Sequence, residues 1–190
     1  MAEEAAPPQA FTRAVASLSG ITPRPEIVIE DAPAPARLAP YSYALGGTVS
    51  RAGEEVATGR LILLYDPAGH EAWDGTLRLV TYVTAELEPE IAADPLLAGV
   101  GWSWLVDALD GYRAAYHAIA GTITLTTSTR FGDLAGPPAS CDLEIRASWT
   151  PENDDCAAHM RAWCALLAST AGLPPPGVTA LAGRGVGTQA

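Results

Sequence analysis

The clearest pattern in the chain is a short alternation of apolar and polar residues near position 145. Leu143, Ile145 and Ala147 alternate there with charged side chains. A period of two places one set of side chains on each face of a strand, so this segment predicts a half-buried strand.

Weaker patterns predict the other strands. β-Branched residues at 27–29 follow Pro23 and Pro25, which predicts an extended segment at 26–31. Strands are also expected from Tyr41 to the turn at 50–55, over 56–65, over 77–87 and over 122–131. The short connections between neighbouring strands favour antiparallel hairpins.

Three segments have helical spacing instead. Residues 9–19 repeat apolar side chains at this spacing and are followed by Gly20. A second helix is expected from Asp94, with Trp102, Leu105 and Leu109 on its core side. The last helix is expected to begin with Thr150 as N-cap and Pro151 as first residue, and to end at Gly172.

The order α-ββββ-α-ββ-α separates helices from runs of strands. It predicts an α+β domain in which an antiparallel sheet of about six strands carries its helices on one face. The length of 190 residues suits one domain, placed at 9–173. Residues 1–8 are expected to form a flexible tail, and the Pro- and Gly-rich residues 174–190 a disordered one.

Charge narrows the range of partners. The formal net charge is −11, and the eleven basic residues are all Arg and are scattered singly. Phosphate backbones and anionic membranes are bound by clustered cations, so neither direct nucleic-acid binding nor membrane binding is expected. The first residues lack the features of a signal peptide, and the three cysteines are expected to be free thiols of a cytoplasmic protein.

The loop 66–75 (DPAGHEAWDG) holds the densest polar chemistry of the sequence. Its side chains Asp66, His70, Glu71 and Asp74, with Trp73, could bind a divalent metal or perform acid–base chemistry. The alternative is a polar turn whose side chains cap the backbone, as is usual at hairpin ends. A second His would have to replace Asp74 to complete the zinc-peptidase motif.

No other segment predicts a cofactor or a metal. Cys156, His159 and Cys164 share the last helix, but at 100° per residue Cys164 points away from His159. His159 is expected on the flank of that helix near Asp155, and His117 has no evident partner in the sequence. We therefore expect no catalytic residue, no metal ligand and no cofactor.

Trp104 is a second candidate for binding. It lies two positions from Trp102, roughly 200° around the helix, so one face cannot bury both rings. Trp104 either covers a neighbouring loop or anchors a partner protein.

Several segments together resemble an uncharacterised actinobacterial family, domain of unknown function 3000. They are RLAP at 37–40, DPAGHEAW at 66–73, ELEPE at 86–90, ADPLL at 93–97, WSWL at 102–105 and EIRASWT at 144–150. The resemblance runs from about residue 10 to about residue 175 and implies an actinobacterial cytoplasmic protein, but it brings no activity, ligand or catalytic residue with it.

Two functions fit these observations. The first is a non-enzymatic interaction module, an adaptor or regulator, whose acidic surface suits a basic partner through electrostatic steering. The second is an enzyme or metal-dependent binding protein that uses the 66–75 loop. Convergence of Asp66, His70, Glu71 and Asp74 in one cleft would favour the second.

Overall fold

The computed structural model describes residues 6–92, 94–133 and 139–175. Most of the tail expected at 1–8, and all but the first two residues of the tail expected at 174–190, lie outside these ranges. None of the helices in the described residues is both long and apolar enough to span a bilayer.

Four α-helices, one 3₁₀ helix and six strands make up the described part of the chain. In chain order they are α1 (Gln9–Ser19), β1 (Ile27–Ala32), β2 (Tyr41–Arg51), β3 (Glu54–His70), η1 (Glu71–Trp73), β4 (Gly75–Leu87), α2 (Pro89–Ala92), α3 (Leu97–Gly111), β5 (Tyr116–Thr129), β6 (Ala139–Pro151) and α4 (Ala157–Thr170).

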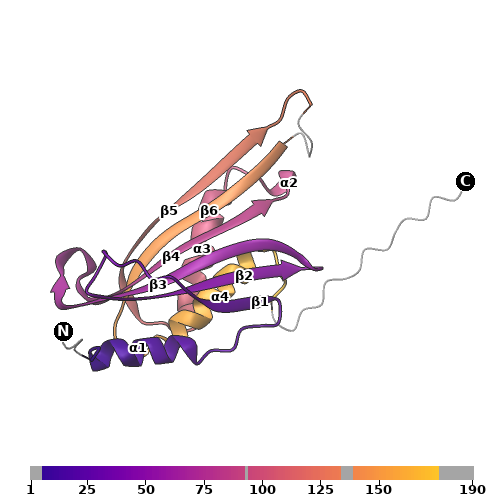
Figure 1. The fold of residues 1–190 in the computed structure, drawn as a ribbon. Coiled ribbons are helices and arrows are strands. Elements are labelled where there is room, and N and C mark those ends of the chain that lie inside the picture. The colour runs from indigo at the N-terminus through magenta and orange to yellow at the C-terminus, as the bar shows by residue number, and fades with distance from the viewer. Residues whose placement is uncertain (1–5, 93, 134–138, 176–190) are drawn as a thin grey trace, which may run out of the picture.

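The strands form one antiparallel sheet in the order β1-β2-β3-β4-β6-β5. Helices α3 and α4 cover one face, α1 packs against α4, and β5 and β6 extend beyond the other strands (Figure 1). The expected fold class and order of elements are confirmed. Helix α2 was not predicted, because four residues are too few to show a helical periodicity.

The core lies between the sheet and α4. Trp163 is fully buried and donates a hydrogen bond from Nε1 to Thr81 Oγ1 at 2.8 Å. Gly47 and Gly59 face each other in the β2–β3 pairing beneath this ring. A Cβ at Gly59 would lie 2.6 Å from Leu167 Cδ2, so only glycine lets α4 approach the sheet this closely.

The start of α4 differs from the prediction. Thr150 and Pro151 are the last residues of β6, and the helix begins at Ala157. Thr150 is buried in the sheet, where its hydroxyl accepts a hydrogen bond from Arg78 Nη1 and donates one to the carbonyl of Trp73. These tertiary contacts outweigh the local capping preference of the sequence.

Two other boundaries also differ. Asp94 caps a turn by accepting a hydrogen bond from the Leu96 amide, and α3 begins only at Leu97. Strand β5 begins at Tyr116, six residues before the expected start, with an irregularity in its pairing between His117 and Ala120.

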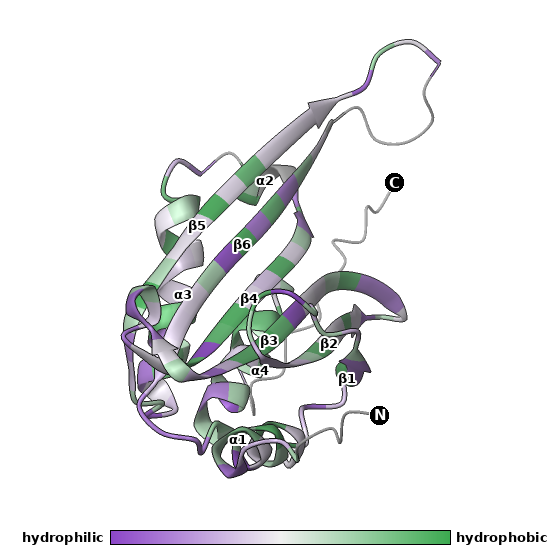
Figure 2. Ribbon diagram, turned by 60° about the vertical axis from the view of Figure 1, so that its left-hand side comes forward, coloured by the Kyte–Doolittle hydropathy of each residue, from purple (hydrophilic) through white to green (hydrophobic). Residues whose placement is uncertain are grey.

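The face of the sheet away from the helices is polar. Thr58 and Thr84 share a hydrogen bond of 2.9 Å across β3 and β4. Tyr82 donates to Glu144, which also accepts from Arg146 at 2.7 Å. Figure 2 shows the resulting alternation along β6, with hydrophilic and hydrophobic bands in turn.

Candidate functional site

Two polar side chains of the 66–75 loop accept hydrogen bonds from backbone amides of the same loop. Asp66 Oδ1 accepts a hydrogen bond from the Ala68 amide at 2.9 Å. His70 Nδ1 accepts one from the Ala72 amide at 3.2 Å and so caps η1. Both side chains satisfy backbone donors two residues ahead, which is the turn-capping role of such residues.

The aromatic and the other acidic residues of the loop occupy separate places around η1. The rings of His70 and Trp73 are stacked, with centroids 4.9 Å apart. Glu71 begins η1, and Asp74 ends it in the left-handed conformation with φ of 54°. The loop therefore brings His70 and Trp73 together but does not gather its carboxylates around a common centre.

Among the described residues, no three His, Cys, Asp or Glu side chains lie together in a way that could hold a metal ion. The convergence that would favour the enzyme or metal-binding alternative is thus not seen in Asp66, His70, Glu71 and Asp74. The geometry supports the turn-capping interpretation of the loop.

His117 has partners that its sequence context did not reveal. Its Nδ1 lies 2.8 Å from Glu152 Oε1, and its Nε2 lies 2.8 Å from the carbonyl of Asp74 and 3.8 Å from the carboxylate of the same residue. The Asp74 carbonyl and then Glu152 raise the pKa of His117. These contacts tie the loop to the start of β5 and the end of β6.

Both tryptophans of α3 are partly exposed, whereas only Trp104 was expected to be. Both Trp102 and Trp104 are half-buried and pack against the core cluster. The fully buried side of α3 consists of Leu97, Leu105 and Leu109, with Gly101. Trp102, expected in the core, lies instead against β5, where a Cβ at Gly121 would come within 2.7 Å of its Cζ3.

Strand β5 forms an open edge of the sheet that the sequence did not reveal. It pairs with β6 on one side and is the last strand of the described sheet on the other. From residue 120 to residue 129 every residue except Ile123 is exposed. This segment holds no charged residue and no proline, and Figure 2 shows pale and green bands along β5 beside the purple bands of β6.

The opposite edge is protected in the usual ways. Strand β1 has only six residues, carries Glu30 and Asp31, and lies between Pro25 and Pro33. Short length, charge and proline all hinder the addition of a further strand. The two edges of one sheet therefore differ in their capacity to accept a partner strand.

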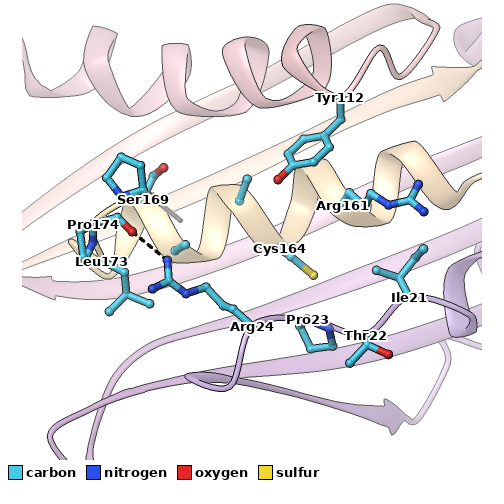
Figure 3. A pocket seen from close by; sticks show the side chains of 13 residues that line it. Ile21, Thr22, Pro23, Arg24, Tyr112, Arg161, Cys164, Ser169, Leu173 and Pro174 are labelled. Atoms are coloured by element: carbon cyan, nitrogen blue, oxygen red, sulfur yellow. Dashed lines mark hydrogen bonds between the residues drawn. The ribbon is translucent and has the colours of Figure 1, made fainter. Parts of the chain in front are cut away.

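A pocket of about 440 Å³ lies between α4, the 21–24 segment and the residues after α4. Figure 3 shows Tyr112 reaching from the end of α3 with its hydroxyl directed at α4, and the Cys164 sulfur directed at the 21–23 segment. At one end Arg24 Nη1 donates to the Pro174 carbonyl at 2.8 Å. This pocket was not predicted, because its walls come from three segments that lie far apart in the chain.

A sequence model of the family described as "Protein of unknown function (DUF3000)" matches residues 7–179. The chain belongs to this family. Neither a curated protein nor a solved structure matches the chain.

Proposed function

We propose that this member of the DUF3000 family is a non-enzymatic protein-interaction module, an adaptor or regulator, which accepts an extended segment of another protein at the edge of β5. The observation that carries the proposal is the unprotected length of this edge. An edge strand presents a row of backbone N–H and C=O groups to which a partner strand can pair.

The charge next to the edge favours a basic partner. Asp142 on β6 lies directly opposite Glu86 on β4, and both carboxylates are exposed. Like charges in this position are unfavourable in the isolated sheet. Asp142 also lies beside Thr126 of β5, one strand in from the edge, so a long cationic side chain on an added strand would approach the Asp142 carboxylate.

The helix side of the edge offers an apolar contact. Trp102 lies against Gly121, and Leu125 is 36% exposed on the same face of β5. Alternate side chains of an added strand would pack here, because successive residues of a strand point to opposite faces. The preferred partner segment thus alternates basic and apolar residues.

The cytoplasm is the proposed location. Cys141, Cys156 and Cys164 are all free and buried. Burial raises the pKa of Cys156 to about 12, so this thiol stays protonated and unreactive at neutral pH. Free thiols of this kind suit a reducing compartment.

The test compares single lysine substitutions on the two edges. Leu125→Lys introduces a charge into the β5 edge, and Val28→Lys does the same on β1, where the side chain is 53% exposed. Capture from host lysate is followed by hydrogen exchange of the complex. We expect the wild type and Val28→Lys to retain the same partner with slowed exchange in β5, and Leu125→Lys to lose it while melting normally.

The proposal fails if Leu125→Lys retains the partner as well as the wild type does, or if the slowed amides lie outside β5. It also fails if sedimentation shows a homodimer that Leu125→Lys dissociates, because the edge would then be occupied by a second copy.

Trp104 is tested separately. Its packing against the core predicts that Trp104→Ala lowers the free energy of unfolding by about 3 kcal/mol. A Trp104→Ala variant that unfolds like the wild type but loses the partner would instead place Trp104 in the binding surface.

A further inference from the structure

We propose that the pocket beside α4 binds a small molecule with an apolar body and one carboxylate, and that Arg161 pairs with the carboxylate. This site is independent of the β5 edge. Its volume of about 440 Å³ falls within the range of pockets that hold small ligands, roughly 300–1,000 Å³.

The charges around the pocket favour an anion. Two arginines, Arg24 and Arg161, line it, and none of the lining residues is acidic. This is notable in a chain with a net charge of −11. The charge of Arg24 is paired with the Glu26 carboxylate, so an anion that enters the pocket meets the positive charge of Arg161, although the molecule as a whole is negative.

The two arginines have different roles. Arg24 is held in place, because Nε and Nη2 each donate to Glu26 at 2.9 Å and Nη1 donates to the Pro174 carbonyl. Arg161 makes no hydrogen bond or ion pair with any of the described residues, and its side chain projects from α4 at the other end of the pocket (Figure 3). Its guanidinium is thus available for a bidentate contact with a carboxylate.

The floor between these ends is apolar. It is formed by Ala165 and Ala168 of α4, with Leu173 and Ile21 beside them. Cys164 adds a neutral sulfur, since burial raises the pKa of its thiol to about 11. A hydrocarbon chain along this floor would remove apolar surface of both the ligand and the protein from water.

The side chain of Tyr112, the residue after α3, lines the pocket and directs its hydroxyl towards α4 (Figure 3). It offers a further donor to a polar group of the ligand. A medium-chain carboxylate satisfies the three features together: a negative head for Arg161, an apolar body for the floor, and a size that the pocket holds.

The test uses decanoate, below its aggregation concentration, in isothermal titration against the full chain, with 1-decanol as the uncharged analogue. Arg161→Gln removes the charge, and Arg37→Gln is the matched control on an exposed residue outside the pocket. Ala165→Leu fills the floor without changing the charge.

We expect the wild type and Arg37→Gln to bind decanoate equally. Arg161→Gln should bind about tenfold to a hundredfold more weakly, because a charge-assisted contact is lost. Ala165→Leu should also weaken binding, and every variant should melt close to the wild type.

Four results would overturn the proposal. The first three are no binding of decanoate by the wild type at millimolar concentration, equal binding of 1-decanol, and an equal loss of affinity in Arg161→Gln and Arg37→Gln. Binding that Ala165→Leu leaves unchanged would place the ligand elsewhere and would also reject the pocket.

Discussion

The buried His159 predicts that the free energy of unfolding falls as the pH is lowered. The side chain lies on α4 and is only 3% exposed, and its Nδ1 accepts a hydrogen bond from Trp149 Nε1 at 3.0 Å. Nδ1 can accept only in the neutral imidazole, so protonation would break this bond inside the core. Burial lowers the pKa of His159 from 6.5 to about 4, with a small opposing effect from the charge of Asp155.

The sign of the effect follows from proton binding. Between pH 6.5 and about 4 the unfolded chain protonates this histidine whereas the folded protein does not, so stability falls as the pH is lowered through this range. At about 1.4 kcal/mol per pH unit the loss amounts to about 3 kcal/mol. Below about pH 4 both states are protonated, and this contribution stops changing.

The assay measures the free energy of unfolding by denaturant titration between about pH 7 and pH 4. His159→Asn is the comparison, because its amide oxygen can accept from Trp149 but does not titrate. Carboxylates such as Glu26, whose pKa the neighbouring Arg24 lowers to about 2, contribute equally to both proteins and cancel. Parallel curves for the wild type and His159→Asn would refute the buried neutral histidine.

Three further predictions concern packing and pH. Trp163→Ala should lower the free energy of unfolding by about 3–5 kcal/mol, and an unchanged melting temperature would contradict its central place in the core. Gly59→Ala should lower it by about 1–3 kcal/mol in the same titration, because the new methyl group would collide with Leu167. His117 should stabilise the fold fully below about pH 6.5 and less as the pH rises through its raised folded pKa, since only the imidazolium pairs with Glu152. The advantage of the wild type over His117→Asn should therefore be larger at about pH 6 than at about pH 9, and an advantage that grows with pH would show the opposite sign.

Where local pattern and tertiary contacts agree, the sequence predicted the structure. Leu143, Ile145 and Ala147 are buried in β6 and their charged neighbours face the open side, as the alternation requires. The helix expected to end at Gly172 is present as well, and it buries Met160 and Trp163. These residues have one favourable placement, because moving them would expose large apolar surface.

Where a residue suits two local structures, the sequence alone could not decide which of them it adopts. Thr150 and Pro151 are good residues to begin a helix, yet they end a strand, because buried Arg78 needs the Thr150 hydroxyl as acceptor. His159 was expected on a helix flank beside Asp155 and lies in the core, because Trp149 needs an acceptor. In both cases a partner distant in the chain or on another element determines the outcome.

The sequence by itself determined the α+β class, the order of the elements, the acidic charge and the membership of a family. Only the tertiary structure decided which strand lies at the open edge, that Trp102 lies against it, and that Arg161 and Tyr112 share a pocket. The physical reason is that secondary structure follows from the periodicity of near neighbours, whereas an edge or a pocket exists only after distant segments have packed together.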